Sequence, residues 1–289
     1  MSVSVIGLGA MGGAIAARLA ENGFSVIGFD VSEEARQRFS NRTSTCNSAR
    51  ASGNLTESVN LSDVIITSLP NDDIVNDCVI KQIMPNMKAT QTFIEMSTIL
   101  PQTMKSIAEK LEGKVDEIVD SPVSGGPLEA SDGNLSLLVG CQGGSVKQRT
   151  LEILSKLGTV NIVGKVGDGK SLKLVNNMMS MGNIAVAMEA FQMGANLGLD
   201  PDKMYQVLSK SGGGGVQFNK RGPFLLKDDF FARFAIYLAE KDTRLALETA
   251  HKINYHTPIL ANIHQMYQQA MSQGLGHEDI LALIKLYRK

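Results

Sequence analysis

Several features are missing from this sequence, and each absence excludes a class of protein. The 28 lysines and arginines nearly balance the 29 aspartates and glutamates, so the formal net charge is only −1. Such a chain lacks the electrostatic footprint that binds nucleic acid or an anionic membrane. No uninterrupted apolar run approaches the roughly 20 residues of a membrane-spanning helix. We therefore expect neither nucleic acid nor a membrane as a partner.

Residues suited to disulfides or metal sites are also few. The three cysteines, Cys46, Cys78 and Cys141, are odd in number and scattered, which favours reduced thiols in a cytoplasmic protein over a disulfide framework. The first residues lack the basic segment of a signal peptide, which agrees with that location. The histidines have neither the spacing nor the partner cysteines of a metal site. They are His251, His256, His264 and His277. We expect no bound metal.

The composition that remains is that of a soluble globular protein. The chain has 289 residues, of which 43% are hydrophobic and 20% charged, and this length suits one large or two ordinary domains. Strand and helix patterns alternate up to about residue 163, and only helical patterns follow. We predict a Rossmann-type doubly wound α/β domain over residues 1–163 and an all-α domain over residues 164–289, joined by a long central helix.

The predicted elements follow from short β-rich runs and from helical spacing of apolar residues. The strands are Val3–Ile6, Ser25–Phe29, Asp63–Leu69, Thr92–Met96, Val115–Val119, Leu135–Val139 and Thr159–Val163. The helices of the first domain include Pro101–Leu111 and Ser145–Leu157. Those of the second are Pro201–Leu208, Phe234–Ala250, Ile259–Met271 and Glu278–Tyr287.

A glycine loop joins the first strand to a helix-forming segment. The loop reads Gly7-Leu8-Gly9-Ala10-Met11-Gly12 and has the G-x-G-x-x-G spacing in its expected context, with a strand before it and a helix after it. Gly7 permits the tight turn, Gly9 lets the backbone approach a pyrophosphate, and Gly12 allows close helix–strand packing. The helix start supplies N–H groups for the phosphates. The loop therefore predicts a dinucleotide site.

Asp30 ends the second strand, about 20 residues after the loop. A carboxylate at this place hydrogen-bonds the 2′-hydroxyl of the adenosine ribose and repels a 2′-phosphate. We therefore expect NAD as the cofactor rather than NADP. The alternative is a glycine loop that serves packing alone, with a solvated aspartate.

The central helix is predicted over 169–197, on the order of 43 Å at ~1.5 Å per residue. Between Lys173 and Asp200 its one charged residue is Glu189. A helix that is apolar nearly all round must be buried on nearly all sides. The few amides and the glutamate favour a protein core over a bilayer.

Lys173, Asn177 and Ser180 share one face of this helix by the i, i+4, i+7 rule. Burial and the positive end of the helix dipole both lower the pKa of a lysine here, toward the range of proton transfer at neutral pH. The alternative is a surface lysine that keeps its ammonium in water, beside ordinary amides.

Three other stretches carry polar groups in loops or on helices. Leu69-Pro70 lies at the carboxyl end of a strand, where cofactors sit in parallel sheets. Ser124-Gly125-Gly126 offers a hydroxyl and backbone N–H groups before a helical turn, which suits either a carboxylate or a simple capped turn. The run over 212–215 is four glycines, either a flexible turn or a loop that closes over substrate.

Four motifs, in order along nearly the whole chain, resemble those of the β-hydroxyacid dehydrogenases, which include 3-hydroxyisobutyrate dehydrogenase and tartronate semialdehyde reductase. They are Gly7-Leu8-Gly9-Ala10-Met11-Gly12; Asp120-Ser121-Pro122-Val123-Ser124-Gly125-Gly126 with Gly133-Asn134-Leu135 and Val139-Gly140; Gly167-Asp168-Gly169 with Lys173, Asn176 and Asn177; and Lys241-Asp242. The resemblance implies hydride transfer between NAD and a small 3-hydroxy acid, or the corresponding semialdehyde, in a homodimer or homotetramer.

The resemblance also implies a role for each matching residue. Lys173 is the catalytic general acid and base, and Asn177 orients the substrate beside it. Residues that bind the substrate, its carboxylate above all, are Ser124, Gly125, Gly126, Phe234 and Asp242. Residues beside the cofactor, in addition to the glycine loop and Asp30, are Leu69, Pro70, Thr98 and Lys241.

The chain also departs from its relatives. The glycines at 212–215 replace the serine-rich loop of several relatives, which leaves the substrate's side group open. The chain is too short for a 6-phosphogluconate dehydrogenase, and imine reductases replace the lysine that this chain keeps as Lys173. Two alternatives remain: an NADP-dependent semialdehyde reductase, and a noncatalytic dinucleotide-binding or scaffold protein.

Overall fold

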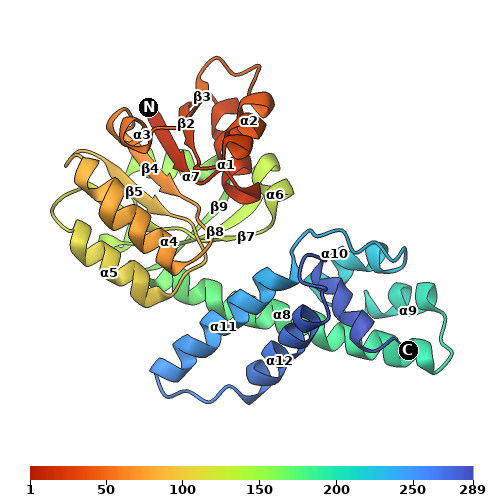
Figure 1. The fold of residues 1–289 in the computed structure, drawn as a ribbon. Coiled ribbons are helices and arrows are strands. Elements are labelled where there is room, and N and C mark those ends of the chain that lie inside the picture. Colours follow the sequence, from red (N-terminus) through yellow and green to blue (C-terminus); the bar gives the residue numbers. More distant parts are fainter. Residues whose placement is uncertain (289) are drawn as a thin grey trace. The chain divides into compact units, whose positions relative to one another are not determined.

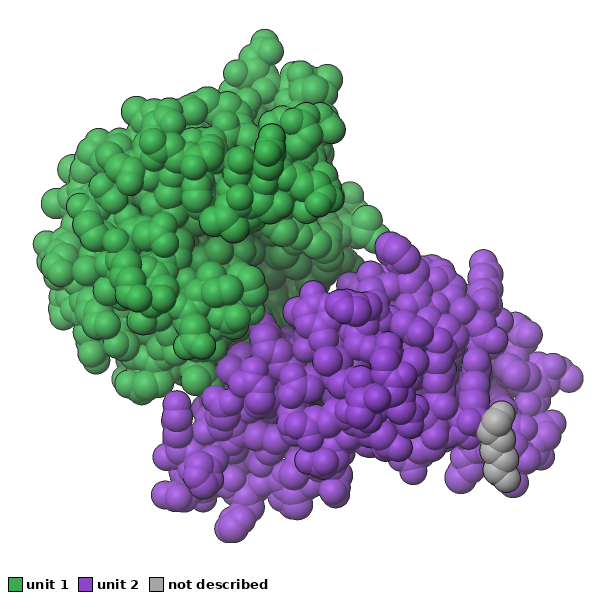
Figure 2. Space-filling view, in the orientation of Figure 1, with its two compact units in different colours: residues 1–173 green, residues 174–289 purple. Residues whose placement is uncertain are grey.

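The computed structural model describes residues 1–288. Its contacts divide the chain into two compact units, Met1–Lys173 and the part from Leu174 onward (Figure 2). The long helix α8, Asp168–Asn196, contributes residues to both units. The predicted domain division, after residue 163, precedes this helix and stays a prediction.

The first unit is built on one twisted sheet (Figure 1). Its strands are β1 (Ser2–Ile6), β2 (Ser25–Phe29), β3 (Ala49–Ser52), β4 (Val64–Thr67), β5 (Thr92–Glu95), β6 (Glu117–Asp120), β7 (Val123–Ser124), β8 (Leu135–Cys141) and β9 (Gly158–Gly164). The order is β3-β2-β1-β4-β5-β6-β8-β7, with β9 beside β8. The six strands from β3 to β6 run parallel, in registers such as Val3 opposite Val26 and Val64. Strand β8 runs antiparallel to β6 and β7.

Helices cover both faces of this sheet. They are α1 (Ala10–Glu21), α2 (Glu33–Arg42), α3 (Leu55–Asn60), α4 (Asp72–Asp77), the π-helix η1 (Cys78–Ile83), the short η2 (Met84–Asn86), α5 (Pro101–Leu111), α6 (Pro127–Asp132), η3 (Gln142–Gly144) and α7 (Gln148–Ser155). One apolar core gathers residues of α1, α2, α6 and α7, and a second gathers those of α3, α4, η1 and α5. Two cores on opposite faces make this the predicted doubly wound α/β fold.

The second unit is all helical, as predicted (Figure 1). After α8 come α9 (Pro201–Leu208), α10 (Val216–Leu225), α11 (Ile236–Lys252), α12 (Pro258–Ser272) and the 3₁₀ segment η4 (Ile280–Leu286). The core of this unit includes Met188 and Phe191 of α8, Tyr267 of α12 and the whole of Ile280–Ile284. Within residues 1–288 we find no helix with both the length and the apolar character to cross a membrane.

One face of α8 differs from the expectation that the helix is buried nearly all round. Eight residues at 3- and 4-residue spacing form an exposed stripe, of which seven are apolar and one is an amide. They are Leu172, Val175, Met179, Asn183, Val186, Ala190, Met193 and Leu197. The opposite face, with Ile184 and Met188, is fully buried. This face is exposed because the other helices of the chain cover only part of the circumference of α8.

Candidate functional site

The glycine loop has a backbone that only glycine fits at two of its positions. Gly7 has φ +96°, and a Cβ there would lie 2.2 Å from the carbonyl oxygen of Ser68. A Cβ at Gly12 would lie 2.0 Å from the carbonyl oxygen of Gly7. Gly9 is different, since a Cβ there would meet nothing within 4 Å. The loop thus packs tightly at its ends and leaves open space at its centre.

That open space lies at the start of α1. Gly9 is the residue before the helix, and the first turn of α1 contains no acidic residue. A pocket of about 240 Å³ adjoins it, lined by Leu8, Gly9, Ala10 and Gly13 of this loop and helix. Free N–H groups and the helix dipole make such a place favourable for a negative group. The geometry fits the pyrophosphate of a dinucleotide.

Asp30 is tied directly to the glycine loop. Its Oδ2 accepts the N–H of Leu8 at 2.7 Å, and its Oδ1 accepts the N–H of Ser32 at 2.8 Å. Arg36 donates to its backbone carbonyl at 2.6 Å. The carboxylate is half-buried, so it remains accessible from solvent. The predicted phosphate loop and the predicted ribose-binding acid therefore lie side by side.

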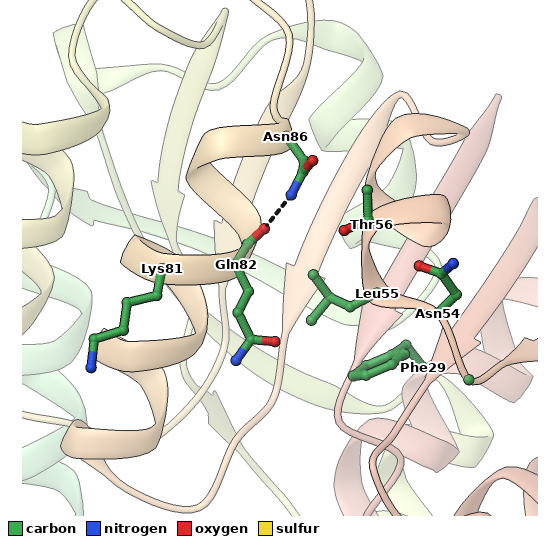
Figure 3. A pocket seen from close by; sticks show the side chains of 8 residues that line it. Phe29, Asn54, Leu55, Thr56, Lys81, Gln82 and Asn86 are labelled. Atoms are coloured by element: carbon green, nitrogen blue, oxygen red, sulfur yellow. Dashed lines mark hydrogen bonds between the residues drawn. The ribbon is translucent and has the colours of Figure 1, made fainter.

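A larger groove opens beside the carboxyl ends of β2 and β3 (Figure 3). It has a volume of about 470 Å³. One side carries Phe29 and Leu55, and the other carries Gln82, whose amide points into the groove (Figure 3). The side chain of Asn86 donates to the backbone carbonyl of Gln82 at 2.7 Å and stabilises this side of the groove (Figure 3). Phe29, which lines the groove, directly precedes Asp30, the residue predicted to bind the ribose.

The next strand-end loops are joined by Ser97. Leu69 follows β4, and its N–H donates to the Ser97 hydroxyl at 2.8 Å. The N–H of Ser97 in turn donates to Glu95 Oε1 at 2.9 Å. Pro70 lies next to Leu69, and Thr98 is next to Ser97. The structure thus brings together the two strand-end segments that carry three of the expected cofactor residues.

Ser124-Gly125-Gly126 forms the turn between β7 and α6. Gly125 has φ +127°, which disfavours any side chain there. The N–H of Gly126 is already engaged, because it donates to Oε2 of Glu129 at 2.8 Å. A substrate carboxylate at this turn would therefore meet the Ser124 hydroxyl and compete with Glu129 for the Gly126 N–H. In the sequence, the one sign of this competing acceptor is a glutamate three residues after Gly126.

Lys173 and Asn177 are both buried on α8, at 9% and 4% exposure. The Nδ2 of Asn177 donates to Asp242 Oδ2 at 2.6 Å, and its Oδ1 accepts from Asn176 at 3.0 Å. Lys241 Nζ lies 3.3 Å from the other carboxylate oxygen of Asp242. Two expected substrate-site residues, both buried, and one expected cofactor residue, partly exposed, thus form one cluster. In it, Asp242 serves to hold the amide of Asn177.

Phe234 lies at the end of a loop that a buried carboxylate organises. Asp279 Oδ2 accepts the N–H groups of Phe234 and Arg233, each at 2.9 Å, and Asp279 Oδ1 accepts from Arg221 Nε at 3.1 Å.

The glycines at 212–215 lie in the segment that connects α9 to α10. A Cβ at Gly214 would lie 2.7 Å from the Leu208 carbonyl oxygen, so this glycine serves packing as well.

A buried ionic cluster at the start of α8 was not predicted from the sequence. Lys170 lies one turn before Lys173, with its Nζ 2.5 Å from Glu95 Oε2. Asp120 accepts the N–H groups of Gly167 and Lys170, at 3.0 and 2.9 Å. Burial raises the pKa of the Asp120 carboxyl, which the Lys170 ammonium opposes. The one sign of it in the sequence was a glutamate at the end of a strand that is buried throughout, Thr92–Glu95. As for metals, residues 1–288 contain no group of three His, Cys, Asp or Glu arranged to hold an ion.

Two family models match the chain in succession. Residues 2–167 match the NAD binding domain of 6-phosphogluconate dehydrogenase, and residues 167–287 match the NAD-binding domain of NADP-dependent 3-hydroxyisobutyrate dehydrogenase. Together they span nearly the whole chain.

Individual relatives agree with these models. The 2-(hydroxymethyl)glutarate dehydrogenase of Eubacterium barkeri is 32% identical, over 100% of this chain and 95% of its own. The 3-sulfolactaldehyde reductase of Escherichia coli (strain K12) is also 32% identical, over 99% of this chain and 96% of its own. A solved 3-hydroxyisobutyrate dehydrogenase from Salmonella typhimurium superimposes with a TM-score of 0.86 at 25% identity, covering 99% of each chain.

Proposed function

The chain belongs to the β-hydroxyacid dehydrogenase family and is an NAD(P)-dependent hydroxyacid dehydrogenase, and we propose that it acts on a small 3-hydroxy acid with NAD and with Lys173 as general acid and base. The observation that carries this proposal is the buried pair on α8, in which Asn177 follows Lys173 by four residues and is held by Asp242. A fixed amide one turn from a buried amine suits the binding and deprotonation of a hydroxyl group.

The residues of the first unit fit a dinucleotide. Gly9 leaves space that a Cβ would fill, at a helix start without acidic residues. We propose that the pyrophosphate binds here, along Gly7-Leu8-Gly9-Ala10-Met11-Gly12, and that Asp30 binds the adenosine ribose. The groove lined by Phe29, Leu55 and Gln82 supports placing the adenine beside it. Leu69, Pro70, Thr98 and Lys241 complete the proposed cofactor contacts.

In the proposed reaction, the chain's own groups bind the acid and move one proton. Ser124, Gly125 and Gly126 hold the substrate carboxylate, and Phe234 limits the space around its side group. When bound, the nicotinamide supplies the acceptor for the hydride that leaves the hydroxyl-bearing carbon. The neutral amine of Lys173 takes the hydroxyl proton, which leaves a carbonyl. In the reverse direction the ammonium of Lys173 returns that proton to the oxygen.

Turnover of a panel of acids tests this proposal. The panel holds 3-hydroxyisobutyrate, glycerate, threonate, 3-hydroxypropionate and 2-(hydroxymethyl)glutarate, each with NAD and with NADP. We expect turnover with NAD that falls ~10²–10⁴-fold in Lys173→Ala, because acid–base help is worth about that much. Lys165→Ala is the control, since Lys165 is exposed and precedes α8. Unchanged activity in Lys173→Ala would remove the lysine from the mechanism.

Reduction of a semialdehyde is a second candidate, favoured by the relative that reduces 3-sulfolactaldehyde. This reduction uses the same groups in reverse. The rate of acid oxidation, compared with the rate of semialdehyde reduction under the same conditions, tells which direction the enzyme prefers. NADH binding without turnover of any acid or semialdehyde would instead support a noncatalytic dinucleotide-binding role.

We further propose that the chain forms a homodimer or homotetramer through α8. The eight residues of the exposed stripe are uncharged, and Glu189 beside them is the one exposed charged residue between Leu172 and Leu197. Exposed apolar patches of more than a few hundred Å² are rare on single chains and mark interaction surfaces. The amide of Asn183 lies near the middle of the stripe, with apolar residues on both sides. An antiparallel second copy would therefore meet the same chemistry, as a twofold interface requires.

A further inference from the structure

Lys170 is a buried lysine that the proposed reaction does not use. Its side chain and that of Glu95 are fully buried, and their charged atoms lie 2.5 Å apart. Lys170 Nζ also donates to the backbone carbonyls of Glu95 at 2.8 Å and Ser97 at 2.9 Å. A buried ammonium is unfavourable unless it is paired and hydrogen-bonded, so this arrangement holds the lysine in one geometry.

These contacts join α8 to the loops beside the proposed cofactor. Glu95 ends β5, and its Oε1 accepts the N–H of Ser97 at 2.9 Å. The Ser97 hydroxyl accepts the N–H of Leu69 at 2.8 Å. Thr98 follows Ser97 directly. Two strand-end loops are therefore connected, through Glu95 and Ser97, to one side chain of α8.

The start of α8 is also held from β6. Asp120 ends that strand and accepts the N–H groups of Gly167 and Lys170. A Cβ at Gly140 or Gly169 would lie 2.1 or 2.7 Å from one of its carboxylate oxygens. The space around the carboxylate is thus closed, and the first turn of α8 has little freedom to shift.

We propose that Lys170 is a positioning residue, which fixes the first turn of α8 against the Ser97-Thr98 loop and so sets where Lys173 stands relative to the cofactor. The proposal rests on the role proposed above for Lys173. Lys170 and Lys173 are three residues apart on one helix, and a displacement of the first moves the second with it. The contacts of Lys170 Nζ go to Glu95 and Ser97, so we expect its loss to spare the binding of the carboxylate at Ser124-Gly125-Gly126.

Two variants separate this role from simple stabilisation. Lys170→Met leaves the Glu95 charge buried without its partner, and we expect a lower thermal midpoint. Glu95→Gln with Lys170→Met removes both charges, and we expect much of the midpoint to return. The tether to the Glu95 and Ser97 carbonyls is still lost in the double variant. We therefore expect kcat to stay roughly 10- to 100-fold low with an unchanged KM for the acid, since small misplacements cost about that much.

Titration of NADH gives a second readout that needs no turnover. We expect weaker NADH binding in the double variant, because the Ser97-Thr98 loop has lost its anchor. Lys165→Met is the matched control. It should leave the thermal midpoint, kcat, KM and NADH affinity unchanged, since Lys165 is exposed. If the double variant does not fold, Glu95→Gln with Lys170→Gln replaces it, with an amide in the lysine's place.

Wild-type kcat and NADH affinity in the double variant would overturn the proposal. A rise in the acid's KM in step with the loss of kcat would also overturn it, as the sign of general loosening. If the wild-type enzyme turns over no acid, the proposed function fails, and NADH affinity alone then decides whether Lys170 anchors the loop.

Discussion

Among single residues, we propose that Asp30 sets the choice between NAD and NADP. Its carboxylate is fixed by the N–H groups of Leu8 and Ser32, so it cannot turn away from a 2′-phosphate without losing both bonds. We expect Asp30→Asn to raise kcat/KM for NADP about 10-fold or more, since a buried or fixed like charge costs on the order of 1.4 kcal/mol or more. The asparagine keeps an acceptor for Leu8, so the loop stays in place.

The control for this prediction is Glu109→Gln. Glu109 is an exposed carboxylate on α5, which packs on the other face of the sheet from α1. This variant removes the same charge without touching the glycine loop, so the NAD-to-NADP ratio should not move. An unchanged ratio in Asp30→Asn would show that another group rejects the 2′-phosphate.

Asp242 offers a second test at this scale. Its Oδ2 accepts from Asn177 at 2.6 Å, and both side chains are buried. Asp242→Asn removes the charged acceptor, and loss of a hydrogen bond to a charged group costs about 1.5–3 kcal/mol, or roughly 10- to 100-fold in kcat/KM if Asn177 contacts the reacting alcohol. Steady-state kinetics beside Glu248→Gln, an exposed carboxylate on the same helix, checks this. Equal losses in both variants would point to the helix rather than the amide.

In the loop before α1, two glycines separate packing from the proposed cofactor binding. Gly12→Ala places a Cβ 2.0 Å from the Gly7 carbonyl oxygen, so α1 must move from β1, and we expect a clear fall in the thermal midpoint. Gly9→Ala meets nothing within 4 Å, so the midpoint should hold. Its methyl group would instead enter the space proposed for the pyrophosphate, and NADH binding should weaken. Tight NADH binding by Gly9→Ala would move the pyrophosphate away from this glycine.

Some helices and strands could be predicted from the sequence, and others could not. The glycine loop, its flanking strand and helix, and Pro101–Leu111 were predicted well, because glycine spacing and apolar periodicity report local structure. Strand β3, Ala49–Ser52, was missed because its sequence, Ala-Arg-Ala-Ser, has no apolar run and becomes a strand by pairing with β2. The predicted helix at 278–287 is a 3₁₀ segment over Ile280–Leu286. Its run of apolar residues predicted a buried helix but could not distinguish a 3₁₀ helix from an α-helix.

Long-range contacts explain most of what the sequence could not predict about the candidate site. Lys173 and Asn177 could be paired by spacing, because both lie on one helix. Glu95 and Lys170 are 75 residues apart in the chain, and their contact depends on how β5 meets the start of α8. The antiparallel pairing of β8 with β6 and β7 is equally non-local. A charged residue in a buried strand was the one local sign of the cluster.

At the scale of the whole molecule, the exposed stripe of α8 leads to the last prediction. Met179 and Val186 are 62% and 63% exposed and lie near its centre. We expect the wild-type protein to be a dimer or tetramer by light scattering, and Met179→Glu with Val186→Glu to be a monomer, since like charges in an apolar interface are unfavourable. Leu61→Glu, an exposed leucine of the first unit, is the control and should keep the wild-type mass. A wild-type monomer, or an unchanged mass in the double variant, would contradict an interface at α8.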